Sequence, residues 1–347
     1  MSQQESAFLN EVAEQPKVLR ELIAFYRGEG QRLLEKWAKL VKEASRVIFS
    51  GMGTSEFAPD AITVALAQQG IDATTRDAGE WLHYPSPTVG IPVLISQSGE
   101  SIETRLLAEQ LKGKGGLVAI TNNEASSLAR AASLVLPMLA GHETAISTKT
   151  YVNTLAVLYL MAQAMEGSAA MENGLARLEK SAEAMRSVNR AGIDQAARLL
   201  ADASAIHFVS RGPAVVAARQ AALTFMEGTR ISAAAYTGGA FRHGPFELVD
   251  ENLRCVFFVP GGTTCELIKK MALDVVEKKG HRLIVKPDMM GELSLPRLDV
   301  PSAPCSVIPR RFALQRSPLP FHRTALTHKR RPPFFQPVVA GRVSRVA

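Results

Sequence analysis

The amino-acid sequence predicts an α/β protein with two tandem modules, each a parallel sheet flanked by helices in a three-layer, flavodoxin-like sandwich. Short apolar runs alternate with helical patterns between residues 46 and 137, which is the order of a parallel sheet covered by helices on both faces. The same pattern returns about 160 residues later along the chain. The chain of 347 residues is also long enough for two domains that each bury a core.

The elements of the first module follow from the spacing of apolar residues. Helix is expected from about Glu5 to Lys42, where apolar residues recur at spacings of three and four. Long helical patterns also run from about residue 148 to residue 201, with a break at 166–168. Strands are expected near residues 46–50, 72–76, 91–96, 116–121 and 133–137, with helices between them that include 56–69 and 102–111.

The second module is predicted from a repeat of the first. Residues 205–209 form a short apolar run, 210–213 a loop of small residues and 214–228 a helical pattern, while the segment that begins at residue 253 echoes 91–101. The expected divisions of the chain are an N-terminal helical segment (1–42), the first module (43–190), the second module (191–300) and a tail (301–347).

Charge and cysteine content exclude several classes of protein. The net charge is +7, but residues 301–347 hold eight Arg and one Lys with no Asp or Glu, whereas the first 300 residues carry 31 basic and 33 acidic side chains. Because the positive charge is confined to this proline-rich tail, which we expect to be irregular, binding to nucleic acid is not expected. The three cysteines form no CxxC pattern, so neither a disulfide framework nor a zinc site is predicted. No apolar segment is long enough to span a membrane and no signal peptide is recognisable, so we expect a cytoplasmic protein without membrane contact.

The loop 96–101, with the sequence SQSGES, is the most informative part of the chain. It lies between a predicted buried strand and a predicted helix, where backbone amides, three hydroxyls and the positive end of the helix dipole converge. An anion fits this setting, and phosphate is the natural candidate. The alternative interpretation is a capped helix start, with Ser98 or Ser101 as the N-cap residue.

A second loop of small residues, GMGTS at 51–55, strengthens the phosphate interpretation. It also joins a predicted strand to a predicted helix, and two such loops meet at the carboxyl edge of a parallel sheet, where these sheets bind ligands. The loop has neither the lysine of a GxxxxGK[ST] motif nor a GxGxxG sequence, so a nucleoside triphosphatase and a dinucleotide site are not predicted. The second module lacks the serine-rich loop, so we expect it to frame the site and not to bind a second phosphate.

Two residues of the second module are candidates for acid–base chemistry. His243 lies between a Gly pair and Gly-Pro in a loop that fixes its backbone, and a histidine pKa lies near neutrality; a surface or structural histidine is the alternative. Glu227 stands at the end of a predicted helix, where the dipole tends to raise a carboxyl pKa and suits it to proton transfer, although most such glutamates are simply exposed. No HxH, HExxH or His/Asp cluster predicts a metal site.

Several sequence motifs together resemble one family. The segments are GMGTS, SQSGES, AGHETAISTKTY, EGTRISAAAY and FRHGP, preceded by EVAEQP near the N-terminus. In this order they are similar to the sugar isomerase (SIS) double-domain family, particularly to the isomerase half of glutamine:fructose-6-phosphate aminotransferase (glucosamine-6-phosphate synthase) and to aminosugar-phosphate deaminases and deglycases. The resemblance covers roughly residues 5–290.

The resemblance implies roles for individual residues. Glu227 matches the glutamate that moves a proton between C1 and C2 of the open-chain sugar. His243 matches the ring-opening histidine, which in the family reaches the active site of the neighbouring subunit, so the resemblance also implies a homodimer. The residues that match the family's contacts to the sugar phosphate and its hydroxyls are Thr54, Ser55, Ser96, Gln97, Ser98, Ala145 and Ser101, the last in place of a threonine.

The implied activity is that of an aminosugar-phosphate isomerase or deaminase, which converts a compound such as glucosamine 6-phosphate to fructose 6-phosphate and ammonia without a metal or redox cofactor. Two departures favour an alternative, a noncatalytic sugar-phosphate-binding or regulatory protein: Thr224 stands where the synthase has a lysine, and the basic tail replaces the family's C-terminal segment. Met1-Ser2 offers no cysteine nucleophile, so no glutaminase half is expected. Lys149 either contacts the ligand or starts a helix, and we favour the helix start.

Overall fold

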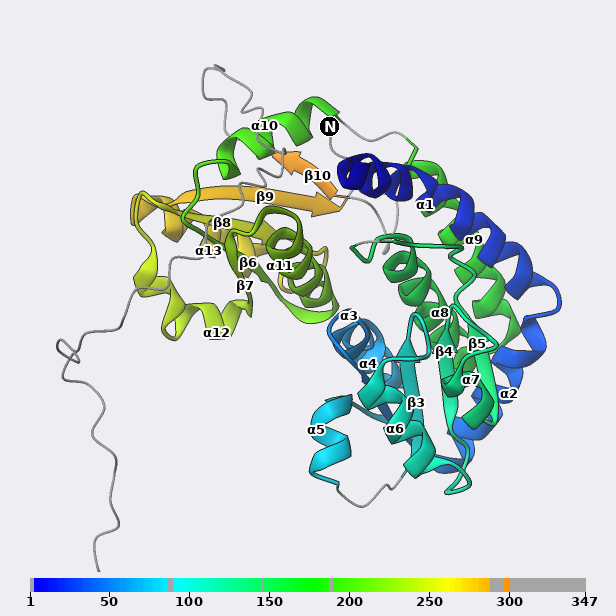
Figure 1. Ribbon diagram of the computed structural model, residues 1–347. Helices are drawn as coiled ribbons and strands as arrows, with labels where there is room; N and C mark the ends of the chain where they lie inside the picture. Colours follow the sequence, from blue (N-terminus) through cyan, green and yellow to red (C-terminus); the bar gives the residue numbers. More distant parts are fainter. Residues whose placement is uncertain (1–2, 86–89, 145, 187–189, 288–295, 300–347) are drawn as a thin grey trace, which may run out of the picture. The chain divides into compact units, whose positions relative to one another are not determined.

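The computed structural model describes residues 3–85, 90–144, 146–186, 190–287 and 296–299. It has the predicted α/β architecture, with two five-stranded sheets that are each flanked by helices (Figure 1). The tail 301–347 and Ala145 lie outside the described residues. Within the described residues, no helix combines the length and the apolar character that crossing a membrane requires.

The first sheet consists of β1 (Arg46–Gly51), β2 (Asp72–Asp77), β3 (Ile91–Ser96), β4 (Val118–Thr121) and β5 (Leu134–Pro137), at the positions that the sequence predicts. The sheet is entirely parallel, in the order β2-β1-β3-β4-β5. The central strands β1 and β3 are continuous apolar runs and are almost completely buried, because helices cover both faces. The strand order reverses between β1 and β3, so the loops after these strands lie at the switch point where open sheets bind ligands.

The connections of the first sheet contain α3 (Thr54–Phe57), α4 (Asp60–Gln68), α5 (Ala78–His83), α6 (Ile102–Leu111) and α7 (Ser127–Ala131). Alternate residues of β1 belong to two separate cores: Val47 packs in one and Ile48 in the other, which shows that both faces are covered. The single helix predicted at 56–69 is wrong, since it is divided between α3 and α4. Pro59 has no N–H to continue the hydrogen bonds of the first helix, so α3 ends before it.

Four long helices pack on one another against one face of the first sheet: α1 (Gln3–Arg27), α2 (Gln31–Ala44), α8 (Lys149–Glu166) and α9 (Ser168–Ala184). The opening helical stretch is interrupted by Gly28 and Gly30. Buried aromatic side chains also make polar contacts here, because the hydroxyl of Tyr26 donates to a β5 carbonyl and the indole N–H of Trp37 to an α8 carbonyl, both at 3.0 Å. The N-terminal helices are therefore part of the first core.

The second sheet consists of β6 (Ala205–Ser210), β7 (Ser232–Thr237), β8 (Leu253–Phe258), β9 (His281–Pro287) and β10 (Pro296–Asp299), in the order β10-β9-β8-β6-β7. All its strand pairs are parallel except β10 with β9. The sequence repeat predicts β6 and β8 but not β7, β9 or β10. In β7, alanines replace the β-branched residues that usually mark a strand, and the strand forms because β6 lies beside it.

The helices of the second module are α10 (Arg190–Leu200), η1 (Gly212–Ala214), α11 (Val215–Thr229), α12 (Gly238–Arg242), η2 (Pro245–Leu248) and α13 (Cys265–Glu277). The helix predicted at 214–228 is α11. It packs on β6 and β7 of its own module and contacts α3 and α4 of the first module. This helix therefore connects the two modules.

His207 is buried in β6 of the second sheet. Only 6% of the residue is exposed, and its ring lies 5.1 Å from that of Tyr236 and 6.1 Å from that of Phe241, measured between ring centroids. Its Nδ1 atom is buried and has no hydrogen-bond partner among the described residues. Burial therefore lowers the pKa of His207 below its ordinary value of 6.5.

Replacing His207 with Phe should make the second module less sensitive to acid. A base whose pKa is lowered by folding contributes stability above its unfolded pKa, and this contribution is lost as the pH falls through 6.5, because the unfolded chain takes up the proton first. The free energy of unfolding of His207→Phe should therefore fall less than that of the wild type between about pH 7 and about pH 5. Urea titrations at both pH values measure the difference. Equal losses in the two proteins would contradict this interpretation.

Candidate functional site

The loops that follow β1 and β3 lie side by side at the carboxyl edge of the first sheet. A Cβ atom on Gly51 would lie 2.8 Å from the carbonyl oxygen of Ile95 and 2.6 Å from the Cβ atom of Ser55. Only glycine therefore permits this approach. The loops 51–55 and 96–101 therefore begin next to each other at this edge.

Hydroxyl groups organise the loop 96–101. The buried Ser96 accepts a hydrogen bond from the amide of Gly99 at 3.1 Å, and its oxygen lies 3.3 Å from that of Ser101. Ser98 accepts from a backbone amide within the loop at 3.1 Å. Ser101 is the N-cap residue of α6, but its side chain makes no capping hydrogen bond. The first amides of α6 therefore keep their capacity to bind an anion.

Gly99 packs the loop against the connection that follows β4. Its φ angle is +66°, and a Cβ atom at this position would collide with the hydroxyl of Ser126. Ser126 caps α7 by accepting from the amide of Ala129 at 3.2 Å, and the carbonyl of Gly99 accepts from the amide of Leu128 at 3.1 Å. A side chain at position 99 would disturb both contacts.

Asn122, which follows β4, holds the outer side of the same loop. The backbone N–H of Asn122 donates to the backbone carbonyl of Gln97 at 3.1 Å, while the side chain of Gln97 is exposed. The side chain of Asn122 accepts from the amide of Ala140 and donates to the carbonyl of Gly141, both at 2.7 Å. Asn122 is not among the residues predicted from the sequence, although an asparagine directly after a strand is a signal that marks such a loop.

The hydroxyl of Thr54 is engaged by the second module. It donates to Oε1 of the buried Gln220 at 2.8 Å, and Nε2 of Gln220 donates to the carbonyl of Ser147 at 3.3 Å and to the hydroxyl of Thr224 at 3.0 Å. This chain of hydrogen bonds holds α11 on the first module. The adjacent Ser55 is half-buried. Gln220 is not among the site residues predicted from the sequence, because its role depends on partners far away in the chain.

An ion pair between the modules reinforces this contact. Arg219 of α11 lies 2.7 Å from Asp60 of α4, and Asp60 also accepts from the hydroxyl of Thr75 at 3.0 Å. Glu56 is half-buried close to this pair. Burial raises the pKa of Glu56, as does the negative charge of Asp77, while Arg219 acts in the opposite direction.

Glu143 caps the start of α8. One of its carboxylate oxygens accepts from the amides of Thr148 and Lys149 at 2.8 and 2.7 Å, and the other accepts from the hydroxyl of Thr150. Ala145, a predicted site residue of the same segment, lies outside the described residues. Glu143 is not among the site residues predicted from the sequence, because it caps the helix across a loop and not from the usual N-cap position.

Two carboxylates of α1 hold the same segment. Glu11 is buried and accepts from the amide and the hydroxyl of Thr144 at 2.7 and 2.8 Å. Lys149 is the first residue of α8 and only 3% exposed, and its ammonium lies 2.5 Å from Glu14 and 2.6 Å from the carbonyl of His142. Lys149 therefore ties the helix start to α1.

Glu227 lies near the C-terminal end of α11. Gln220, Thr224 and Glu227 share one face of the helix, because successive members are four and three residues apart. Glu227 is thus on the face that docks on the first module. Much of the residue is exposed, but desolvation raises the pKa of its carboxyl above the ordinary value. A Cβ atom on Gly228 would lie 3.5 Å from Cδ1 of Ile146, so this end of α11 also lies beside the segment that precedes α8.

His243 follows α12 and is exposed. Its amide donates to the carbonyl of Ala240 at 3.2 Å. In the part of the chain that the structure describes, no hydrogen bond, ion pair or ring contact links His243 to the loops 51–55 and 96–101 or to Glu227.

Cavities among the described residues include the following two. One of about 650 Å³ lies in the second module beside α12, η2 and α13, and one of about 720 Å³ lies between α1, α2, α8 and α9. Neither is lined by Ser55, Ser98 or Glu227. The described ranges contain no group of three or more His, Cys, Asp and Glu side chains that could hold a metal ion.

The family model of the SIS domain matches residues 40–164 and 199–285. The chain belongs to the SIS domain family. One matched range covers the first sheet and the other covers most of the second, so the SIS domain is present twice. The resemblance seen in the sequence motifs is therefore confirmed.

Curated relatives of this SIS chain include enzymes named glutamine–fructose-6-phosphate aminotransferase (isomerizing). The enzyme of Bartonella henselae is 28% identical over 337 residues, which cover 91% of this chain and 55% of the relative. That of Methanocaldococcus jannaschii is 30% identical over 260 residues, which cover 73% of this chain and 23% of the relative. The chain thus spans about half the length, or less, of these relatives.

Solved structures with the same fold include three sugar-phosphate proteins. The C-terminal domain of glucosamine-fructose-6-phosphate aminotransferase from Francisella tularensis has a TM-score of 0.74 at 23% identity, covering 82% of this chain and 90% of that one. Glucosamine-6-phosphate deaminase from Thermotoga maritima has a TM-score of 0.61 at 21% identity, with 83% and 86% covered. Tagatose-6-phosphate ketose/aldose isomerase from Escherichia coli has a TM-score of 0.65 at 19% identity, with 85% of each chain covered. These similarities show the SIS fold.

Replacing Gly99 with Ala should destabilise the SIS chain more than the matched change Gly113→Ala. Both glycines have a positive φ angle, +66° and +76°, so each variant carries backbone strain of about 1 kcal/mol or more. Only at position 99 does the new methyl group meet other atoms, those of Ser126, which should add about 1–3 kcal/mol. Urea unfolding of both variants measures the difference. The same loss of stability in both would show that the loop is not packed as described.

Proposed function

We propose that this SIS chain binds a phosphorylated aminosugar and interconverts its aldose and ketose forms, with glucosamine 6-phosphate as the representative substrate and release of ammonia as the deaminating outcome. The observation that carries the proposal is the pair of adjoining loops 51–55 and 96–101, which have the hydroxyls of Ser55, Ser98 and Ser101 at one carboxyl edge. The family match supports the same class of ligand.

The loop 96–101 has the donors that a phosphate group needs. The hydroxyls of Ser98 and Ser101, the exposed amide of Gln97 and the first amides of α6 can all donate to phosphate oxygens, and the positive end of the helix dipole favours the charge. Ser96 is buried and shapes the loop from beneath. Tight binding of the remote phosphate orients the small sugar for reaction.

We assign the proton transfer to Glu227. The interconversion needs one base that moves a proton between two neighbouring carbons of a cis-enediol or the corresponding enediolamine, without a metal or redox cofactor. Desolvation raises the pKa of Glu227, which makes its protonated form easier to reach in the middle of the reaction. Its position on the docking face of α11 supports a role next to the loops of the first module.

We assign ring opening to His243, acting in the site of the neighbouring subunit of a homodimer. The exposure of His243 and its lack of described contacts with the loops of its own chain support action on another chain. We expect this enzyme to act in the cytoplasm on small molecules, without nucleic acid or membrane.

The second candidate function is noncatalytic binding of a sugar phosphate for regulation. Thr224 favours it, because Thr224 stands where the family's synthase has a lysine. Its hydroxyl accepts a hydrogen bond from Gln220 at 3.0 Å and supplies no amine. In this case the loops 51–55 and 96–101 hold the same ligand without turnover.

Glu227→Gln should lower the turnover of glucosamine 6-phosphate by about 100-fold or more, because glutamine cannot accept the proton. The measurement is the release of fructose 6-phosphate and ammonia. Glu109→Gln is the matched control, since Glu109 is exposed on α6 and makes no part of the proposed site. Wild-type turnover in Glu227→Gln would refute the assignment, whereas sugar-phosphate-dependent thermal stabilisation without any turnover supports the second candidate.

A mixture of two inactive variants should regain activity if His243 acts across subunits. After equal amounts of Glu227→Gln and His243→Ala are unfolded and refolded together, about half of the dimers are mixed, and one of the two sites in each has both native residues. Turnover should therefore return to about a quarter of the wild-type value. Refolding each variant alone is the control. No recovery in the mixture would show that His243 does not serve the partner subunit's site.

A further inference from the structure

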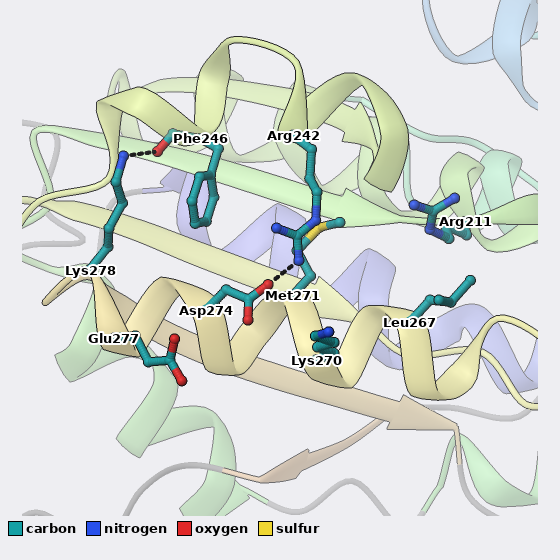
Figure 2. A pocket seen from close by; sticks show the side chains of 9 residues that line it. All are labelled: Arg211, Arg242, Phe246, Leu267, Lys270, Met271, Asp274, Glu277 and Lys278. Carbon is teal, nitrogen blue, oxygen red and sulfur yellow. Dashed lines mark hydrogen bonds and ion pairs between the residues drawn. The ribbon is translucent and has the colours of Figure 1, made fainter.

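The second module contains the cavity of about 650 Å³, which is separate from the sugar site proposed above (Figure 2). Arg211, directly after β6, lines it together with residues of α12 and η2, which follow β7, and of α13, which follows β8. Since β7 and β8 lie on opposite sides of β6, the Arg211 end of the cavity lies at the switch point of the second sheet. Its lining residues are Arg211, Arg242, Phe246, Leu267, Lys270, Met271, Asp274, Glu277 and Lys278.

Two of the cations that line the cavity are not neutralised by any described residue. Arg242 forms an ion pair with Asp274, and Lys278 lies 2.8 Å from Glu247. Arg211 and Lys270 have no carboxylate partner among the described residues. An anion that enters the cavity therefore meets two free positive charges.

Of these two cations, Arg211 is the stronger evidence for an anion site, because part of its guanidinium is buried. Its Nε atom is inaccessible to solvent and has no hydrogen-bond acceptor in the described part of the chain. A Cβ atom on residue 238 would lie only 2.6 Å from this Nε, so Gly238 makes room for the arginine. A buried charged donor without an acceptor is unfavourable, and an anion bound to the same guanidinium compensates its charge.

The other lining residues indicate at which end of the cavity an anion binds and which chemical groups of the ligand lie beside it. Figure 2 shows Arg211 and Leu267 at one end of the cavity and Glu277 with Lys278 at the other. Glu277 repels an anion at its own end, so the charge belongs at the end with Arg211. Leu267 and the ring of Phe246 offer apolar surface for the rest of a small molecule.

We propose that this cavity binds the phosphate group of a small phosphorylated metabolite, through Arg211 and Lys270. The guanidinium offers paired N–H donors that match phosphate oxygens, and the ammonium adds a second charge. The inference goes beyond the proposed function of the first module. It differs from the expectation that the second module only frames a site, since the proposed donors are cations and not hydroxyls.

Calorimetric titration of the full chain with inorganic phosphate tests the proposal. The titrations use Ser98→Ala as the parent protein, so that binding to the first module is weakened. Adding Arg211→Gln and Lys270→Gln should weaken phosphate binding by about tenfold or more, because two charge-assisted contacts are lost. Arg211→Lys should retain part of the affinity. Lys279→Gln is the matched control, because Lys279 follows α13, is exposed and does not line the cavity.

The outcomes separate the two sites. Loss of binding in the double variant, with binding retained in Lys279→Gln and unchanged far-ultraviolet circular dichroism in both, supports the proposal. Unchanged phosphate affinity in the double variant overturns it, as does an absence of phosphate binding in the parent protein. Turnover of glucosamine 6-phosphate, measured with Ser98 intact, tests the first site alone, so failure of the proposed function does not affect this result.

Discussion

The arrangement of the candidate site depends on the hydrogen bonds of one buried amide, that of Gln220. The hydroxyl of Thr54 donates to it, and it donates to the carbonyl of Ser147 and to the hydroxyl of Thr224. Leaving such a buried group unpaired costs about 1–3 kcal/mol, so α11 is stable in its place only where the first module supplies Thr54 and Ser147 as partners. These hydrogen bonds therefore determine how α11 packs against the loop 51–55. They also determine the position of Glu227, which lies on the same face of the helix.

The N-terminal helix α1 belongs to the same framework. Its carboxylates Glu11 and Glu14 hold Thr144 and Lys149, on either side of the backbone that offers the Ser147 carbonyl to α11. The hydrogen bond from Lys149 lowers the pKa of Glu14, so this carboxylate stays charged in its contact with the helix start. A helix that precedes both SIS domains thus contributes to the geometry at the point where they meet.

The two SIS domains place different chemistry at equivalent positions of the same fold. After β1 and β3 the first domain has hydroxyls and open helix amides, which bind an anion by directed hydrogen bonds. After β6 the second domain has Arg211, whose charge is not neutralised by a described carboxylate. In both sheets the strand order reverses at these loops, which is the position where open parallel sheets bind ligands.

The sequence by itself determined the α/β class, the duplicated module and the serine-rich loop, because apolar periodicity and small residues between a strand and a helix are local signals. It did not predict β7, β9 or β10, which pair with strands that neighbour them only in space. The tertiary structure alone decided that the hydroxyl of Thr54 binds Gln220 and that Lys149 is buried against Glu14, since these partners lie 166 and 135 residues apart. Contacts between residues so distant along the chain leave no periodic pattern, and only folding brings them within hydrogen-bonding distance.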